Sequence, residues 1–594
     1  MSYSMHTHTC GELRESNIGE EVTLTGWVWH RRDHGGLIFV DLRDRAGVTQ
    51  LEFDPEVCDE ATFHEAETIR SEWPIMVSGT VRERPEGQNN DKLATGAIEV
   101  YVTKIVVLNT SKTPPFQIED HVDTAEDVRL RYRYLDLRRP KMMSNLKLRS
   151  DFTFALREAF HGSDFMEVET PSLFKSTPEG ARDFLVPSRM QPGHFYALPQ
   201  SPQLLKELLM VGGVERYYQV AKCFRDEDLR KDRQPEFTQV DVEMSFVEED
   251  DVMATIEDVL HDAFARVGVD MPTPLRRISY WDAMDTYGID KPDTRFGMTL
   301  HDVTSIFAGS AFRLFANAAE TDGQYVKCIN AKGAGAWPRA RIDKLGEVAA
   351  GFGAKGLAWF AFKADGSWNS SFKKFVSEVE IEALRAEMDA EPGDLLLFAV
   401  ADRLQADEIL GGMRLHMADA LEIPREGHDF LWVVDFPLFH WDEERGAFAA
   451  EHQPFTQPME DDIEKLASGD RDTILSCGSH TYDFVMDGFE AGGGGMRIHN
   501  ADLQMQILEL LGFTKERAEA QFGFLMEALT FGAPPMGGFA LGLDRVCMLL
   551  TGSDSIREVM AFPKTSSGSD LMSAAPSKVT EAQLEELSLA LRHE

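Results

Sequence analysis

The richest group of residues for polar chemistry lies between Phe224 and Phe246, in the stretch FRDEDLRKDRQPEFTQVDVEMSF. Its first half is so charged that it must be solvated or must hold a polyanion. These charges belong to Asp226, Glu227, Asp228, Arg230, Lys231, Asp232 and Arg233. From Thr238 onwards apolar and polar residues alternate, which predicts a half-buried strand, and 216–225 also reads as a strand. We therefore expect an antiparallel hairpin with a polar working face, the alternative being a surface hairpin with a charged turn.

Two further stretches place polar residues where they could contact a substrate. The sequence GFEAGGGGMRIHN at 488–500 places Glu490 and Arg497 on either side of four glycines. Glycine lets the backbone approach a substrate closely, although a flexible loop is the alternative. The sequence QSPQLLKELL at 200–209 puts Gln203 and Lys206 on one face of a helix, where a lysine is usually solvent-exposed.

Three motifs in order along the chain carry a family resemblance. DFMEVETPSL at 164–173, FRDE at 224–227 and GFALGLDRVCMLL at 538–550 resemble motifs 1, 2 and 3 of the class II aminoacyl-tRNA synthetases. Together they are far more specific than any one of them. The resemblance extends over nearly the whole chain to the bacterial-type aspartyl-tRNA synthetases.

This resemblance implies roles for the residues that activate an amino acid with ATP. Arg225 would contact the α-phosphate and the substrate carboxylate, since a guanidinium binds such groups in pairs, and Glu227 would hold adenine or ribose. Arg545 would contact the γ-phosphate; with Arg225 and Glu227 it forms the expected catalytic set. Asp483 and Glu490 would bind Mg²⁺. The further ATP-binding residues are Asp226, Gln234, Gly542, Leu543 and Asp544.

The same resemblance implies a site for aspartate. Lys206 and Arg497 would clamp its side-chain carboxylate, with Gln203 and Arg225 also in contact. Glu179 and Asp241 would lie near its ammonium group. His452 would gate the substrate, although many relatives carry a second histidine where this chain has Gln453.

Composition limits where such a protein works and what it binds. The chain has 60 basic and 100 acidic residues and a formal net charge of −40, so a nucleic acid must be met by local basic patches. One candidate is the basic segment 129–149, which is either a solvated helix face or an RNA contact. Six scattered cysteines and the lack of a long apolar run favour a soluble protein of the reducing cytoplasm. We expect neither a membrane nor a DNA partner.

The predicted fold is a multidomain α+β protein. Five short β-rich segments with one helix, 60–71, suggest an OB-fold anticodon-binding barrel in residues 1–108. Its expected RNA face comprises Trp27, Trp29, Arg31, Arg32, Phe39, Arg43 and Arg45. A hinge at 109–130 precedes the antiparallel-sheet catalytic domain, whose parts, 131–291 and 425–565, flank an inserted α+β domain at 292–424. The predicted C-terminal extension is 566–594.

Helices in the predicted insertion are expected at 340–350, 373–387 and 401–420, and a last helix at 581–592. A helix at 141–160, a strand at 165–170 and Pro171 match the family's dimer interface, which implies a homodimer.

The predicted function is ATP-dependent ligation of L-aspartate to tRNA(Asp), and also to tRNA(Asn), through an aspartyl-adenylate. His34 and Gly87 resemble the residues of family members that accept both tRNAs. A discriminating enzyme restricted to tRNA(Asp) is the first alternative, and a catalytically silent RNA-binding paralogue is the second. Asparaginyl- and lysyl-tRNA synthetases share the motifs but lack the insertion.

Overall fold

The computed structural model describes residues 5–121, 123–177 and 180–592. Its chain divides into two compact units. The first unit holds the N-terminal residues up to Arg149 with Leu229–Gln234 and Asp554–Val579, and the second unit holds the remainder. Among the described residues, no helix is both long enough and apolar enough to cross a bilayer.

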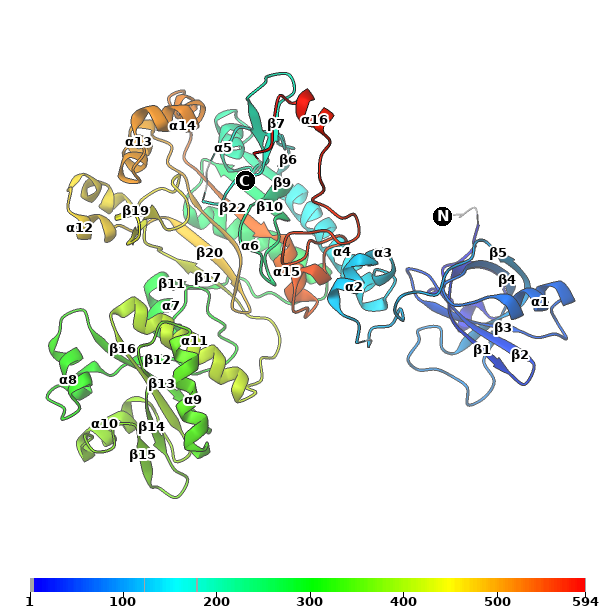
Figure 1. The fold of residues 1–594 in the computed structure, drawn as a ribbon, viewed down its shortest axis with the longest axis horizontal. Helices are drawn as coiled ribbons and strands as arrows, with labels where there is room; N and C mark the ends of the chain where they lie inside the picture. Colours follow the sequence, from blue (N-terminus) through cyan, green and yellow to red (C-terminus); the bar gives the residue numbers. More distant parts are fainter. Residues whose placement is uncertain (1–4, 122, 178–179, 593–594) are drawn as a thin grey trace. The chain divides into compact units, whose positions relative to one another are not determined.

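A closed five-stranded barrel, blue in Figure 1, dominates the first unit, with strand order β1-β2-β3-β5-β4. The strands are β1 (Glu21–His34), β2 (Leu37–Arg43), β3 (Val48–Phe53), β4 (Pro74–Glu83) and β5 (Ile98–Val107). Side chains alternate between the apolar interior and the outer surface, as every second residue of β4 shows. The predicted OB-fold barrel is confirmed. Its helix α1 (Glu60–Thr68) ends before the expected Ser71.

The basic segment 129–149 was expected to be either a solvated helix face or an RNA contact. Several of its cations are instead buried or paired within the protein. The segment forms α2 (Glu126–Arg131), α3 (Arg133–Asp136) and the start of α4 (Pro140–Gly162). Arg133 and Arg139 are buried, and their guanidinium groups bond the wholly buried Asp136 at 2.6 and 2.9 Å. Arg129 pairs with Glu558, the last residue of η5 (Ile556–Glu558), at 2.6 Å. We correct the interpretation accordingly: several of these cations hold the first unit together.

The second unit is built on an eight-stranded, mostly antiparallel sheet with the order β11-β17-β20-β21-β22-β10-β9-β6 (Figure 1). Its strands are β6 (Met166–Glu167), β9 (Arg216–Phe224), β10 (Glu236–Ser245), β11 (Arg276–Ser279), β17 (Phe430–Val434), β20 (Thr481–Met486), β21 (Phe489–Met496) and β22 (Met536–Gly542). The helices packed with it include α5 (Gln203–Val211), α6 (Glu249–Arg266), α13 (Ala501–Leu510), α14 (Lys515–Leu529) and α15 (Leu543–Leu550). Smaller elements are η1 (Glu15–Asn17) in the first unit, and β7 (Leu185–Pro187), β8 (Phe195–Ala197), β18 (Phe439–Asp442), β19 (Ala447–Ala450), η4 (Glu460–Ala467), α12 (Arg471–Leu475) and α16 (Glu581–Glu586) in the second.

The predicted hairpin forms between β9 and β10. Glu236 pairs with Phe224 at the loop end, and Met244 pairs with Arg216 at the other. On its far side β10 pairs with β22, which carries the third motif. The hairpin therefore lies inside the sheet. The polar residues Asp241, Glu243 and Ser245 of β10 are buried, whereas Arg216 and Lys222 of β9 face water.

The glycine run is a strand and not a loop. Gly492–Gly495 lie in β21, between β20 and β22. A Cβ on Gly494 would lie 2.0 Å from the carbonyl oxygen of Gly538, and one on Gly493 would lie 2.4 Å from Asp483 Oδ1. Glycine is needed here because neighbouring strands and a carboxylate occupy the space of a side chain.

Between β11 and β17 the chain forms a second sheet with the order β12-β13-β16-β14-β15. Its strands are β12 (Leu300–Asp302), β13 (Tyr325–Ala331), β14 (Ala358–Phe362), β15 (Trp368–Ser370) and β16 (Leu395–Ala401). Around it lie α7 (Tyr280–Tyr287), η2 (Thr304–Phe307), α8 (Arg313–Glu320), η3 (Ala334–Ala336), α9 (Arg339–Ala350), α10 (Glu378–Glu387) and α11 (Arg403–Ala420). Alternate residues of β16 enter two separate apolar clusters, so both faces of this sheet are covered.

Several predicted boundaries were wrong. Helix α10 begins at Glu378 instead of Lys373, because Ser377 caps it in a reciprocal box with Glu380. Helix α11 begins at Arg403, after the N-cap Asp402. The last helix, α16, stops at Glu586 instead of Arg592, and the strand predicted at 165–170 is only the two residues of β6.

Candidate active site

A pocket of about 270 Å³ opens over the central strands of the eight-stranded sheet. Its lining comes from α5, β10, β20, β21, β22 and their flanking loops. Nine predicted site residues line it: Gln203, Lys206, Arg225, Glu227, Asp241, His452, Asp483, Glu490 and Arg497. The fold thus brings into one place side chains from segments that are far apart in the sequence.

One wall of the pocket is a buried cluster of four charges. Lys206 Nζ lies 3.2 Å from Asp241 Oδ1 and 3.2 Å from Glu243 Oε2. Arg497 Nε donates to Glu243 Oε1 at 2.9 Å. All four residues are at most 2% exposed. Two cations and two anions offset one another, which makes their burial tolerable.

Some buried atoms of this pocket have no hydrogen-bond partner among the described residues. They include the donors Arg497 Nη1 and Arg225 Nε and the acceptor Asp241 Oδ2. Arg225 also lies over the ring of Phe237, 5.2 Å from its centroid. A buried polar group without a partner costs free energy, so these atoms are suited to a ligand that offers both a carboxylate and an ammonium group.

A second wall holds two carboxylates and a histidine. Asp483 Oδ2 lies 3.3 Å from His452 Nε2, while Asp483 Oδ1 has no hydrogen-bond partner among the described residues. Burial raises the pKa of Glu490, and the nearby Asp483 raises it further. Burial lowers the pKa of His452, but Asp483 and Glu490 outweigh this effect and raise it to about 9. This region therefore attracts positive charge.

Two residues of the third motif, Asp544 and Arg545, form hydrogen bonds to the backbone of the strands around the pocket. Arg545, in the first turn of α15, donates from Nη1 to the backbone oxygen of Glu490. The neighbouring Asp544 is buried and accepts a hydrogen bond from the backbone N–H of Thr238 at 2.7 Å. The residues of motifs 2 and 3 are thus locked together through β10.

The outer surface of the barrel carries a chain of polar contacts. Arg32 bonds Asp41 at 2.9 Å and Gln50 at 3.3 Å, and Gln50 in turn donates to Glu99 at 2.8 Å. Arg82 continues the chain to Glu99 at 2.9 Å. Exposed donors and acceptors on barrel strands can read the edges of unpaired bases.

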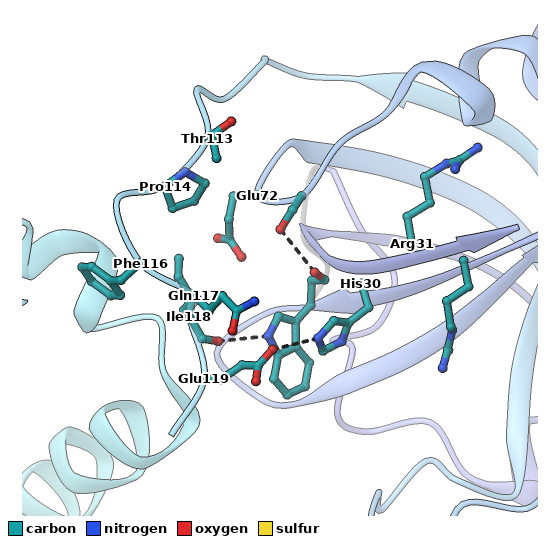
Figure 2. A pocket seen from close by; sticks show the side chains of 12 residues that line it. His30, Arg31, Glu72, Thr113, Pro114, Phe116, Gln117, Ile118 and Glu119 are labelled. Atoms are coloured by element: carbon teal, nitrogen blue, oxygen red, sulfur yellow. Dashed lines mark hydrogen bonds and ion pairs between the residues drawn. The ribbon is translucent and has the colours of Figure 1, made fainter. Parts of the chain in front are cut away.

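Three residues expected on that RNA face are engaged elsewhere in the first unit. Arg43 is 4% exposed and pairs with Glu72, and Arg138 lies over the ring of Trp27. Trp29 Nε1 donates to Ile118 O at 3.0 Å, beside a pocket of about 710 Å³. Figure 2 shows His30 and Glu119 pointing toward one another across this pocket, 3.2 Å apart. Trp27 and Trp29 therefore contact the segment that follows the barrel, while Arg43 is paired inside the barrel domain, a correction of the predicted RNA face.

Comparison with known families agrees with this geometry. Residues 125–566 match the tRNA synthetases class II (D, K and N), and residues 22–108 match the OB-fold nucleic acid binding domain. The chain belongs to the class II tRNA synthetases.

Similar synthetases are known from several bacteria. The chain is 52% identical to the aspartate–tRNA(Asp/Asn) ligase of Symbiobacterium thermophilum, over 98% of each sequence. It is 51% identical to the aspartate–tRNA(Asp/Asn) ligase of Persephonella marina, over 98% of this chain and 96% of the relative. It is also 51% identical to the aspartate–tRNA ligase of Agathobacter rectalis, over 99% and 98%.

A solved structure shares the synthetase fold at lower identity. The asparaginyl-tRNA synthetase from Pyrococcus horikoshii, complexed with asparaginyl-adenylate, matches with a TM-score of 0.58 and 18% identity, over 94% of this chain and 98% of that one. At this identity the match concerns the fold alone.

Some predicted synthetase residues lie apart from the pocket lining or outside the described structure. Glu179 falls outside the described residues. Gln234 belongs to the first unit, where its amide bonds both backbone groups of Lys564, at 2.7 and 3.0 Å. Asp226 is exposed, and Gly542 and Leu543 lie where β22 meets α15. The contact of Glu179 with the aspartate ammonium group and the contacts of the other four residues with ATP stay predictions.

The sequence interpretation missed two buried acidic residues, Glu243 and Glu207, that bond residues of the pocket lining without lining the pocket themselves. Glu243 holds both clamp cations and is completely buried. One signal existed, because Glu243 shares the polar side of the alternating strand with Asp241. Glu207 had none, since a glutamate after Lys206 on a helix is ordinary at a surface.

Proposed function

We propose that this chain ligates L-aspartate to tRNA(Asp) and also to tRNA(Asn), using ATP and passing through an aspartyl-adenylate. The observation that carries the proposal is the set of unpartnered buried atoms in the pocket. Arg497 Nη1 can donate to a side-chain carboxylate, and Asp241 Oδ2 can accept from an ammonium group. The names of the bacterial relatives support the same substrate and both tRNAs.

The pocket suits aspartate better than asparagine or lysine because of its charges. Lys206 and Arg497 contribute two cations, and in the free protein Asp241 and Glu243 balance them. Arg497 keeps one guanidinium nitrogen for a ligand, and a carboxylate gains a charge-assisted hydrogen bond there that a neutral amide would not. A lysine side chain would meet repulsion.

For the first step, we propose that Arg225 holds the amino-acid carboxylate against the α-phosphate of ATP. Its guanidinium stabilises the charge that builds up as the carboxylate oxygen attacks and pyrophosphate leaves. Glu227 would bind the adenosine part and Arg545 the γ-phosphate. These three residues position the reactants and need not form covalent bonds.

Asp483 and Glu490 are the residues that would hold Mg²⁺. The fit rests on Asp483 Oδ1, which has no hydrogen-bond partner among the described residues, and on Glu490, whose pKa is raised by burial and by the nearby Asp483. Within the described residues there is no group of three or more acidic, histidine or cysteine ligands, which suits an ion that takes its other ligands from substrate phosphates. When bound, Mg²⁺ would neutralise charge on the ATP phosphates.

We further propose a cytoplasmic homodimer with the domain boundaries given above. Phe154, Met166 and Leu173 are each at least 50% exposed, and large exposed apolar side chains often mark an interface. Phe154 and Met166 lie on the helix and strand expected at the dimer contact, and Leu173 follows shortly after Pro171. All six cysteines are buried as thiols, which supports a reducing compartment.

Two assays test the proposed function. ATP–pyrophosphate exchange should depend on L-aspartate, and the enzyme should then charge purified tRNA(Asp) and tRNA(Asn) at rates within about tenfold of each other. Absence of exchange would refute the enzyme and favour a silent RNA-binding paralogue. Charging of tRNA(Asp) alone would establish the discriminating enzyme instead.

A further inference from the structure

Glu207 is a completely buried acid directly behind the wall of the pocket. It follows Lys206 on α5 and is 0% exposed. Its Oε1 accepts a hydrogen bond from Gln203 Nε2 at 2.6 Å, while its Oε2 has no partner among the described residues. Gln203 lines the pocket, but Glu207 does not.

Burying a carboxyl group in this position costs free energy unless hydrogen bonds or nearby charges offset the loss of water. On the same helix Leu204 and Met210 pack into an apolar cluster with Phe455 and Leu508, and burying a polar group there costs free energy. Burial raises the pKa of Glu207 to about 8; Glu243 adds to the rise, and Arg497, the hydrogen bond from Gln203 and Lys206 oppose it. In either protonation state an oxygen of Glu207 can accept the hydrogen bond from Gln203.

The contact between the two side chains fixes the amide of Gln203. An amide carries its donor nitrogen and its acceptor oxygen on opposite sides of one carbon. Because Glu207 holds the nitrogen on the inner side, the oxygen is left for the pocket. Gln203 is itself only 6% exposed and one helical turn from Glu207, so its side chain has little freedom to choose another orientation.

We propose that Glu207 is a positioning residue that orients the Gln203 amide so that its carbonyl oxygen accepts from the ammonium group of the bound amino acid. The inference rests on the proposed function. With Asp241 Oδ2, the pocket then offers two acceptors to the ammonium group, while Arg497 takes the side-chain carboxylate. A rotated amide would instead present an NH₂ group, which has nothing to donate to on an ammonium.

The test measures aspartate-dependent ATP–pyrophosphate exchange by the full-length enzyme. Glu207→Met removes the acceptor, so the KM for aspartate should rise about tenfold, with kcat and the KM for ATP little changed. Glu207→Gln keeps an acceptor oxygen and should keep the KM for aspartate within about threefold of wild type. Because both residues act through one contact, Glu207→Met combined with Gln203→Met should be no worse than Gln203→Met alone.

A matched control separates positioning from loss of stability. Glu257 on α6 is also a buried glutamate, bonded to Trp432 Nε1 at 2.8 Å and absent from the pocket lining. Glu257→Met should lower the unfolding temperature without changing the KM for aspartate. Wild-type exchange tests the proposed function itself. An unchanged KM in Glu207→Met, or penalties that add in the double variant, would overturn the role of Glu207.

Discussion

The chemistry of single residues in this synthetase depends on buried charges that face one another. Glu243 joins Lys206 and Arg497, so the two cations of the proposed aspartate clamp are held in place before any substrate arrives. A preorganised clamp loses less conformational entropy on binding than two free side chains would. The same arrangement means that removal of Glu243 should disturb both cations at once.

At the residue scale, Arg225 gives the sharpest prediction. Arg225→Lys keeps the positive charge but loses the planar, paired donors of the guanidinium, including the unpartnered Nε. Adenylate formation, measured by pyrophosphate exchange, should fall on the order of 100-fold or more. Arg277→Lys, the same change at an exposed residue paired with Asp250, should have little effect. Near-normal pyrophosphate exchange by Arg225→Lys would show that Arg225 does not stabilise the transition state of adenylate formation.

The positions of the site residues could be predicted from the sequence only through the motifs. The family resemblance implied that Arg225, Glu490 and Arg497 belong to one site, and the structure brings all three to one pocket. Their roles stay predictions. Two supporting acids were missed: Glu243, which holds Lys206 and Arg497, and Glu207, which holds Gln203. Polar residues of an alternating strand or a helix normally face water, so the pattern alone does not show that these two are buried.

At the scale of elements, local patterns predicted the kind of element better than its ends. Alternation identified the hairpin of β9 and β10 and the strands of the barrel. A flexible loop was the alternative for the glycine run, but it forms β21 because the backbones of two neighbouring strands pair with it. The start of α10 depended on a capping interaction of Ser377, which residue composition between 373 and 387 does not reveal.

One contact between elements predicts a pH-dependent stability. His480 bridges Glu249 on α6, at 2.7 Å, and Glu460 on η4, at 2.9 Å. Its hydrogen bond to Glu249, partly opposed by burial, raises the pKa of His480 to about 9. A raised histidine pKa stabilises the fold fully below the unfolded value near 6.5, and this stabilisation is lost as the pH rises through about 9.

His480→Gln should therefore lower the unfolding temperature by about 1–3 °C at pH 6.5, and the two proteins should converge near pH 10. Thermal unfolding between pH 6 and 10 measures this. The control His440→Gln removes an exposed histidine that bonds Glu451, and it should change little at any pH. A penalty that stays constant with pH would contradict the assigned titration.

At the scale of the whole molecule, tRNA charging links the barrel to the catalytic sheet. His34 ends β1 and is exposed, and Gly87 has a positive φ of 80° with open space beside it. Both residues are therefore accessible to an anticodon. A histidine can donate or accept a hydrogen bond, which would allow two different bases at one position.

His34→Leu should lower kcat/KM for tRNA(Asn) by about tenfold relative to tRNA(Asp), the scale of one base contact. Pyrophosphate exchange, which needs no tRNA, should be unchanged. His64→Leu, at an exposed histidine on α1, is the matched control and should leave the ratio as in wild type. An equal loss with both tRNAs would exclude His34 as the residue that relaxes specificity.

The order of strands in the catalytic sheet has a consequence for synthesis of the protein on the ribosome. Strand β10 ends at Ser245, but its neighbour β22 begins at Met536, 291 residues later. At 5–20 residues per second, the nascent chain waits roughly 15–60 s before that neighbour exists. During this interval one edge of β10 has no strand to pair with, and an unpaired edge invites aggregation. We therefore expect the nascent chain to need protection by chaperones until β22, in the last tenth of the sequence, has been translated.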